Sequence, residues 1–226
     1  MIAPVAPRAS AWPMLRAMVG VGAFCGLLIV GVYELTRPVI ERKKAEALER
    51  AILEVVPAAA SSASFRLTAE DRFEPASGPA GKETRVHAAY DAAGALVGFA
   101  VEARGQGYQD TIRVLWGYAP DRQAIVGLRV LESKETPGLG DRIESDPAFA
   151  ENFRELDVSV DEAGTALAHP IVAVAHGTKS NPWEVDGITG ATISSKAIGR
   201  ILDESAEFWA PRLRRELATF ERREAP

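Results

Sequence analysis

Small and hydroxyl-bearing residues are concentrated in residues 186–195, which read DGITGATISS. Gly190 and Ala191 would let the backbone approach a ligand closely, because neither carries a bulky side chain. Thr192 and Ser194 stand at an expected strand-to-helix turn, where free helix N–H groups and the positive end of the helix dipole favour an anion. Serine and threonine also cap helices that bind nothing. From the residues alone, an anion site and a plain helix cap are therefore both open.

A second glycine-rich stretch, ETPGLG, occupies residues 135–140 and by itself predicts an ordinary turn. Three aromatic residues lie near these stretches in the sequence, namely Tyr108, Trp116 and Trp183. Each could stack on a planar ligand, but a place in the hydrophobic core is the expected role of all three.

The composition excludes several kinds of redox centre. The chain has one cysteine, Cys25, so an internal disulfide framework, a thiolate zinc site and an internal iron–sulfur cluster are excluded. Its histidines, His87, His169 and His176, lack the spacing of metal ligands. The net charge of −5 argues against nucleic acid as a partner. Redox chemistry in this chain would therefore require an organic cofactor.

Residues 186–194 resemble the flavinylation motif of the FMN-binding domain family, D-x-x-[ST]-G-A-T-x-[ST]. The residues that fall on motif positions are Asp186, Thr189, Gly190, Ala191, Thr192 and Ser194. The resemblance implies that Thr192 bonds FMN covalently through the flavin's phosphate. It also implies a maturation partner, a flavin transferase that makes the bond from FAD with magnesium. A phosphodiester keeps one negative charge, which the start of a helix tolerates well.

The ETPGLG stretch resembles the flavin-contacting loop of the same family, and residues 105–108 (GQGY) resemble its G-x-G-Y segment. Together the resemblances extend over roughly residues 88–202. Ser133 and Lys134 depart from the family, where histidines commonly precede the loop, and the role of Lys134 is open. The cofactor-binding residues implied beside Thr192 are Glu135, Thr136, Gly138, Leu139, Gly140, Thr189, Gly190, Ala191 and Ser194.

An uncharged apolar run at residues 17–33 predicts a membrane-spanning helix. A cleaved signal peptide is the competing interpretation, but no small-x-small cleavage site follows Tyr33. Basic residues are more numerous after the run than before it, which by simple counting would keep the following domain in the cytoplasm. Long domains cross membranes largely regardless of such charges, so the count does not decide the orientation.

The pattern of the remaining chain predicts an α+β fold: one N-terminal transmembrane helix and then a mixed FMN-binding domain with antiparallel strands. We expect a helix at 39–56, with Pro38 in its first turn and Pro57 ending it, loops at 57–64 and 75–82, and hairpin strands at 85–90, 95–103, 110–118 and 124–131. Asp146 should cap a short helix, 171–175 should form a strand, and a long helix from Thr192 or Ser194 should break near Pro211. The expected domains are a cytoplasmic head (1–16), a transmembrane helix (17–35), connecting helix and loops (36–82), the FMN-binding domain (83–210) and a C-terminal helical tail (211–226).

The anchor, the sequence Thr36-Arg37-Pro38 and the helix after it resemble G subunits of the Rnf complex, an ion-translocating ferredoxin:NAD oxidoreductase. The resemblance implies an electron-relay subunit, not an independent catalyst, that works with other subunits of a membrane complex. It implies a single-pass protein of the bacterial inner membrane with the flavin domain on the periplasmic side. The C subunit of the sodium-translocating NADH:quinone reductase is the nearest alternative, and a membrane-tethered module without redox function is the other.

Overall fold

The computed structural model describes residues 12–76, 78 and 83–221. The chain divides into two compact units, Met1–Glu46 and Ala47–Pro226. Three parts of the predicted organisation lie outside the described residues: most of the head (1–11), most of the 75–82 loop and the end of the tail (222–226).

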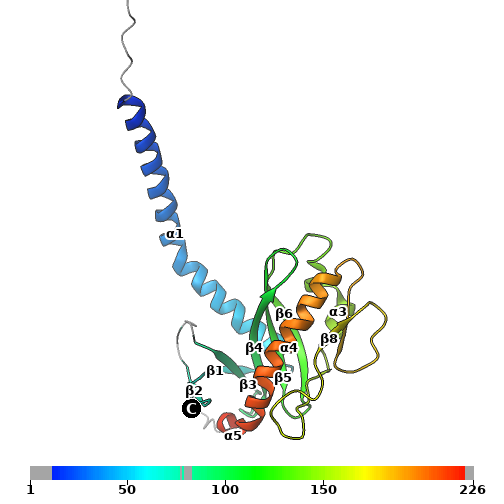
Figure 1. Ribbon diagram of the computed structural model, residues 1–226. Helices are drawn as coiled ribbons and strands as arrows, with labels where there is room; N and C mark the ends of the chain where they lie inside the picture. Colours follow the sequence, from blue (N-terminus) through cyan, green and yellow to red (C-terminus); the bar gives the residue numbers. More distant parts are fainter. Residues whose placement is uncertain (1–11, 77, 79–82, 222–226) are drawn as a thin grey trace, which may run out of the picture. The chain divides into compact units, whose positions relative to one another are not determined.

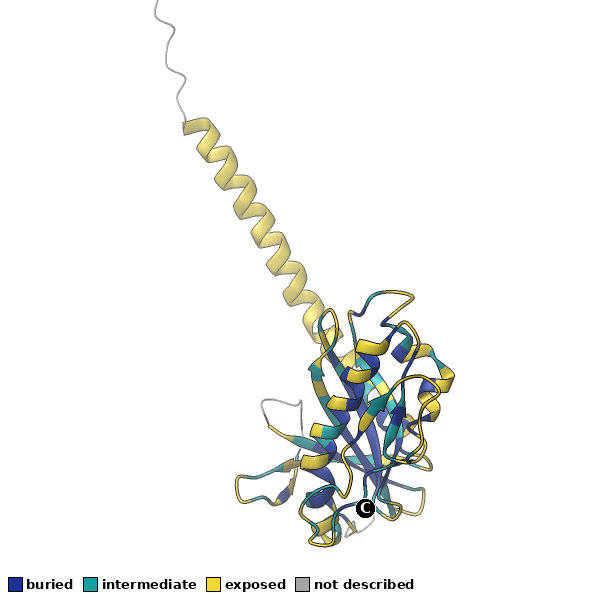
Figure 2. Cartoon of the chain, turned by 45° about the vertical axis from the view of Figure 1, so that its right-hand side comes forward, coloured by how far each residue is buried: buried dark blue, intermediate teal, exposed yellow. Residues whose placement is uncertain are grey.

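Helix α1 runs without interruption over Trp12–Val55 and contains Pro38 in its interior. The prediction of a separate helix starting at Pro38 is therefore wrong. Proline removes one backbone donor, but it does not end a helix whose flanking residues favour helix, and an Arg37–Glu41 ion pair at 3.0 Å continues across it. Among the described residues, α1 is the one helix long and apolar enough to span a membrane. Figure 2 colours α1 as exposed over most of its length, and its large apolar residues are exposed there.

A seven-stranded antiparallel sheet forms the centre of the second unit (Figure 1), with the order β2-β1-β3-β4-β5-β6-β7. Its strands are β1 (Ser61–Leu67), β2 (Phe73–Pro75), β3 (Arg85–Tyr90), β4 (Leu96–Gln106), β5 (Thr111–Ala119), β6 (Ala124–Glu132) and β7 (Leu156–Asp157). The four predicted hairpin strands are confirmed as β3 to β6. The α+β fold class is likewise confirmed.

Strand β1 corrects the prediction of a loop at 57–64. From Ser61 the chain pairs with β3 on one side and with β2 on the other, and Phe65 enters the core. Serine and alanine have weak strand propensity, so the pairing partners decide the conformation here. The residues of this segment alone do not show a strand pattern, so the sequence does not predict the strand.

The two faces of the sheet are covered by different helices. Helix α4 (Thr192–Arg215) packs on one face, where Trp116 of β5 donates from its indole Nε1 to Ser205 Oγ at 3.0 Å. The last turn of α1 packs on the other face against Ala100 and Leu115. Neighbouring residues of a strand point to opposite faces, which is why Leu115 and Trp116 belong to different clusters.

Helix α4 corrects a further prediction. It continues through Pro211 to Arg215, and the break before α5 (Leu217–Glu221) comes at Glu216. Trp209, Ala210 and Leu213 are buried in the core, and this packing offsets the cost of the proline, which removes one helix hydrogen bond and crowds the carbonyl four residues before it. The domain limits 83 and 210 stay predictions, although the core also contains Phe65, Phe73, Leu213 and Phe220.

Shorter elements complete the unit beside α4 and β6: α2 (Arg142–Ser145), α3 (Pro147–Glu151) and the parallel pair β8 (Val172–Val174) and β9 (Glu184–Asp186). The carboxylate of Asp146 accepts from the backbone N–H groups of Ala148 and Phe149, which confirms the predicted cap. The predicted strand at 171–175 is β8. Strand β9 leads directly into the loop before α4, so this region determines where α4 begins.

Helix α1 ends directly on the backbone of the sheet. A Cβ atom at Gly117 of β5 or at Gly127 of β6 would overlap the carbonyl group of Val55. Both positions must therefore be glycine for the helix end to lie this close. The helix ends there, as predicted from Pro57.

We expect Gly117→Ala to lower the free energy of unfolding of the second unit by about 1–3 kcal/mol, because the methyl group forces a backbone shift in a packed interface. Urea unfolding in detergent measures this. Gly31→Ala is the control, since a Cβ at Gly31 of α1 meets no atom within 4 Å. Equal stability of the two variants would mean that the end of α1 does not need this contact.

Candidate functional site

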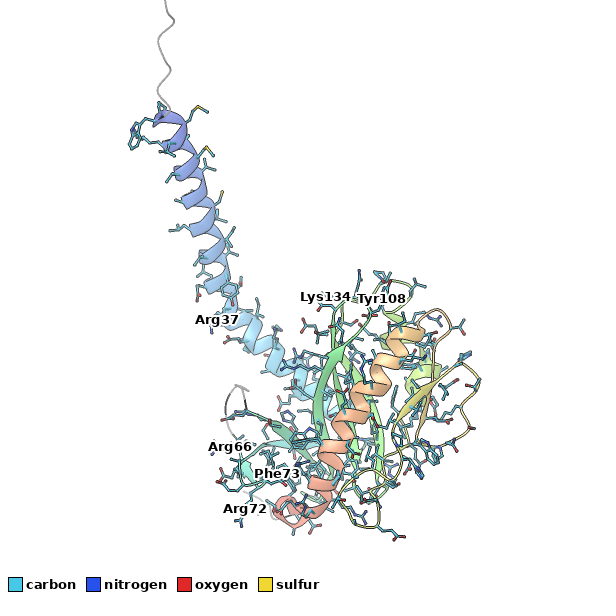
Figure 3. All side chains as sticks on the ribbon, viewed as in Figure 1. Arg37, Arg66, Arg72, Phe73, Tyr108 and Lys134 are labelled. Carbon is cyan, nitrogen blue, oxygen red and sulfur yellow. The ribbon has the colours of Figure 1, made fainter. Side chains whose placement is uncertain are left out.

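Three stretches that are far apart in sequence meet in one pocket of about 370 Å³. Its lining residues come from the segment after β4, from the ETPGLG loop and from the start of α4. They are Tyr108, Glu135, Thr136, Leu139, Gly140, Gly190, Ala191, Thr192, Ile193 and Ser194. We call this cavity the motif pocket. Figure 3 labels Tyr108 at this end of the sheet, close to Lys134.

Helix α4 begins at Thr192, directly at the pocket. Its N-cap residue, Ala191, supplies no side-chain hydrogen bond. The first N–H groups of an α-helix have no acceptor within the helix, so they remain available to an outside acceptor. A plain helix cap would place an accepting side chain here, and this helix has none. The start of α4 therefore favours an anion over a simple cap.

The hydroxyl-bearing residues of the motif differ in how far they are buried. Ser194 and Ser195 are 2% and 1% exposed, whereas Thr189 and Thr192 are exposed. The hydroxyl of Ser195 is occupied in the loop itself, where it accepts from Ile188 N and donates to Ala191 O, both at 3.0 Å. Among these four residues, Thr192 alone is both exposed and part of the motif pocket.

The buried carboxylate of Glu135 joins the three stretches. One oxygen, Oε1, accepts from the backbone N–H groups of Tyr108 at 2.9 Å and Gln109 at 3.0 Å. The other, Oε2, accepts from the hydroxyl of Ser194. Glu135 is only 5% exposed, so these contacts replace water around the carboxylate. We call this arrangement the Glu135 clamp.

Two glycines make room for the clamp. A Cβ at Gly107 would lie 2.5 Å from Glu135 Oε1, and one at Gly140 would lie 2.7 Å from Oε2 and 2.8 Å from Ser194 Oγ. All three distances are too short for a side chain to fit at these positions while Glu135 and Ser194 keep their places. Gly107 of the G-x-G-Y stretch and Gly140 of the ETPGLG stretch thus leave space for the Glu135 carboxylate, which lies between them.

Apolar side chains surround the opening of the motif pocket. Tyr108, Leu139 and Ile193 are 62%, 52% and 57% exposed, and each comes from a different one of the three stretches. The expected core role of Tyr108 is therefore wrong, because its backbone is held by Glu135 while its ring lies outside. Trp116 is in the core as expected. Trp183 is half-buried and stacks on His169, with 3.8 Å between the ring centroids.

Not every predicted site residue lines the motif pocket. Gly138 stands in the turn of the ETPGLG loop with a φ of +75°, a conformation that favours glycine. Thr189 lines a second cavity of about 250 Å³, which shares no lining residue with the motif pocket. We call it the rear pocket, and its lining residues are Arg142, Asp146, Ala148, Phe149, His176, Asp186, Gly187, Ile188 and Thr189.

Other residues near the pocket have no role that the sequence predicts. Lys134 forms an ion pair with Asp110 at 2.7 Å, and this contact holds the pKa of the Asp110 carboxyl below its usual value. Gln109 and Ile193 also contribute to the site, one as a donor to Glu135 and the other as a pocket wall. Neither residue type indicates a function by itself, so only the spatial arrangement identifies them.

We expect Glu135→Ala to cost at least about 2 kcal/mol of unfolding free energy, because it leaves two backbone donors and the Ser194 hydroxyl without their acceptor. Glu135→Gln should cost less than half as much, since its amide oxygen can accept from Tyr108 and Gln109 and its NH₂ group can donate to Ser194 Oγ. Chemical denaturation compares the two variants. A loss in Glu135→Ala no larger than that in Glu135→Gln would rule out the clamp as a stabilising contact.

Residues 107–207 match the model of the FMN-binding domain family. The G subunit of an ion-translocating oxidoreductase complex from Methanosarcina acetivorans is 30% identical over 200 residues, which is 86% of this chain and 92% of the relative. The G subunit of the Na⁺-translocating ferredoxin:NAD⁺ oxidoreductase complex from Acetobacterium woodii is 32% identical over 106 residues, 46% of this chain and 45% of the relative.

The fold resembles that of NqrC from Shewanella oneidensis, with a TM-score of 0.59 and 20% identity over 79% of this chain and 98% of that one. At this identity the likeness concerns the fold alone. The relative from Methanosarcina acetivorans matches over most of both chains, and the family model covers all three stretches of the motif pocket except Gly105 and Gln106. The chain therefore belongs to the family of G subunits of ion-translocating oxidoreductase complexes, with an FMN-binding domain.

Proposed function

We propose that this protein is a membrane-anchored electron-transfer subunit that carries FMN covalently on Thr192. The observation that supports the proposal most is the position of Thr192. Its exposed hydroxyl lies at the uncapped start of α4, in the pocket where three stretches of the FMN-binding domain meet. A phosphodiester there would find free N–H groups and the positive end of the helix dipole.

The residues of the motif pocket fit a tethered flavin. Leu139, Tyr108 and Ile193 offer apolar surface to a ring system, and the exposed residues Gly190 and Thr192 leave room for the phosphate. Bound FMN would accept and release one or two electrons, while the protein sets its position and potential. The buried residues Glu135 and Ser194 hold the walls together and do not need to touch the ring.

Attachment by a flavin transferase is a phosphoryl-group transfer in which FAD is the donor. The Thr192 oxygen bonds to the FMN-side phosphorus, the bond between the two phosphates breaks, and AMP leaves. The hydroxyl proton passes to a base of the transferase, and magnesium neutralises the phosphates. The product is FMN linked through one phosphodiester, so no electron is gained or lost in this step.

The proposed partners are the other subunits of a membrane electron-transport complex, as the names of the relatives indicate for those proteins. The family membership favours an Rnf-type ferredoxin:NAD oxidoreductase over the C subunit of a sodium-translocating NADH:quinone reductase, to which the likeness is one of fold. In such a complex the chain would relay electrons and would not catalyse a reaction alone. A module without redox function would be colourless, and in-gel flavin fluorescence after denaturation separates the two alternatives.

We expect Thr192→Ala to lose an adduct whose mass equals FMN minus water, because the variant has no hydroxyl to bond the phosphorus. Intact-mass analysis of the protein made together with a flavin transferase measures this. Thr192→Ser should keep part of the label. An adduct that persists in Thr192→Ala, on Thr189 or elsewhere, would assign the attachment to another residue.

We further propose that α1 anchors the protein in the bacterial inner membrane with the flavin domain on the periplasmic side. The span is apolar and exposed, and the chain after Pro38 is far longer than the roughly 60-residue loops whose orientation flanking charges govern. The stems of Arg42, Lys43 and Lys44 can lie along the membrane boundary with their charged ends in water.

Protease added to intact spheroplasts should then digest the second unit, because the domain would be outside the inner membrane. A cytoplasmic protein of the same cells serves as the control and should stay intact. Protection of the domain until the membrane is opened would show that the basic residues after the span determine the orientation.

A further inference from the structure

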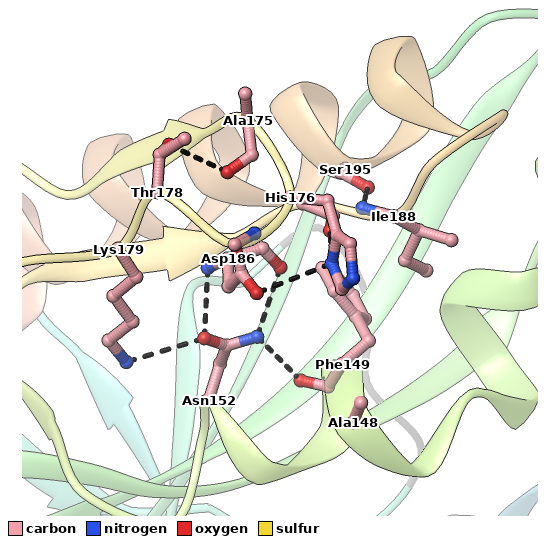
Figure 4. Close-up of polar contacts among 12 residues, drawn as sticks. Ala148, Phe149, Asn152, Ala175, His176, Thr178, Lys179, Asp186, Ile188 and Ser195 are labelled. Carbon is pink, nitrogen blue, oxygen red and sulfur yellow. Dashed lines mark hydrogen bonds and ion pairs between the residues drawn. The ribbon is translucent and has the colours of Figure 1, made fainter.

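Residues 186–191 lead to Thr192, the proposed attachment residue, and we call them the attachment loop. The first residue of this loop is held by a side chain that the flavinylation motif does not include. Asn152, at the end of α3, pairs with the backbone of Asp186 (Figure 4). Its Oδ1 accepts from Asp186 N at 2.9 Å, and its Nδ2 donates to Asp186 O at 3.1 Å. The same Nδ2 donates to Phe149 O at 3.0 Å, which ties the pair to α3.

This contact reproduces the pairing of a neighbouring strand. Strand β9 is hydrogen-bonded to β8 on one edge, and the carboxamide of Asn152 bonds both the N–H and the C=O of Asp186. Asn152 is only 6% exposed, so removing its side chain would leave these backbone groups without a partner away from water. The position of Asp186 is therefore fixed from two sides.

The rest of the attachment loop is fixed in the same way, one backbone group after another. Gly187 N donates to Val174 O at 3.1 Å, and the ring of His176 lies 3.0 Å from Gly187 O. Arg142 donates to Thr189 O at 3.0 Å. The backbone of the loop is therefore bonded at Gly187 and Thr189 as well as at Asp186, and the two side chains that bond it there, Arg142 and His176, line the rear pocket.

The carboxylate of Asp186 also makes its contacts on the side of the rear pocket. Its Oδ1 accepts from Gly177 N at 2.7 Å, and its Oδ2 lies 3.3 Å from His176 Nδ1. Asp186 lines the rear pocket and not the motif pocket. Asp186, the first residue of the motif, is thus bonded on the side of the rear pocket, whereas Thr192, directly after the loop, lines the motif pocket.

We propose that Asn152 is a positioning residue that fixes the attachment loop and thereby the place of the tethered flavin in the motif pocket. The inference rests on the proposed attachment to Thr192. A phosphate tether is flexible, so the flavin keeps one place only if Thr192 stays fixed relative to Leu139 and Tyr108 on the opposite walls. Asn152 helps to fix the position of Thr192, because it links the start of the loop to α3.

The test uses the full chain, loaded with FMN by a flavin transferase, as wild type and as Asn152→Ala. The variant keeps the whole motif, so we expect it to be labelled on Thr192. Its flavin should move more freely, which would lower the fluorescence anisotropy and shift the midpoint potential towards that of FMN on the denatured chain. The melting temperature is measured in parallel, and all spectra are taken well below it.

Two matched variants separate positioning from general stability. Ser205→Ala removes the acceptor of the Trp116 indole, far along α4 from the loop, and should lower the melting temperature without changing the flavin. Lys179→Ala removes a peripheral contact to Asn152 Oδ1 at 3.3 Å and should leave the flavin unchanged as well. A merely structural role of Asn152 would make Asn152→Ala behave like Ser205→Ala.

A labelled Asn152→Ala protein with the anisotropy and potential of the wild type would overturn the proposal. If Asn152→Ala does not fold, Asn152→Asp decides by the same comparison, since it keeps the acceptor for Asp186 N and loses both donors. A wild-type protein without label on Thr192 would instead refute the proposed attachment. The two failures are therefore distinguishable by mass before any spectrum is taken.

Discussion

The carboxylate of Glu135 is the contact on which the motif pocket depends. A buried carboxylate is costly unless donors surround it, and here the donors come from two other parts of the chain, the segment at Tyr108 and the start of α4. The cost of burying the charge is offset only when all three stretches are in place. Gly107 and Gly140 follow from this requirement, because any side chain there would collide with the carboxylate. One interaction therefore explains why three distant stretches of the sequence occur together.

The rest of the fold positions the residues of the Glu135 clamp. The long hairpin of β4 and β5 carries the Tyr108 segment at its turn, and β6 leads into the ETPGLG loop. Helix α4 packs along the sheet and brings its first turn to the same end, while the β8–β9 pair and Asn152 locate the loop before it. On the opposite face, the end of α1 lies against Gly117 and Gly127. The pocket is thus built where strands end and a helix begins, and hydrogen bonds join its loops to these elements.

The sequence predicted those features that depend on local patterns. The alternating strands β3 to β6, the Asp146 cap and the start of the long helix at Thr192 follow from neighbouring residues, and the structure confirms them. Strand β1 was missed because its serines and alanines form a strand only through pairing with β3. Pro38 and Pro211 predict helix boundaries, but the surrounding helix tolerates each. Within the site, the joint role of Glu135 and Ser194 and the outward position of Tyr108 depend on contacts between distant residues, which no local pattern contains.

We propose that a preformed pocket, held together by the Glu135 clamp, receives an FMN bonded to Thr192. In a crystal structure of the flavin-loaded protein, we expect continuous density from Thr192 Oγ1 into the flavin phosphate. We also expect a ring beside Leu139 or Tyr108, and a Glu135 carboxylate that still accepts from Tyr108 N, Gln109 N and Ser194 Oγ. A flavin in the rear pocket beside Arg142 and His176, or a Glu135 side chain released from these three donors, would contradict it.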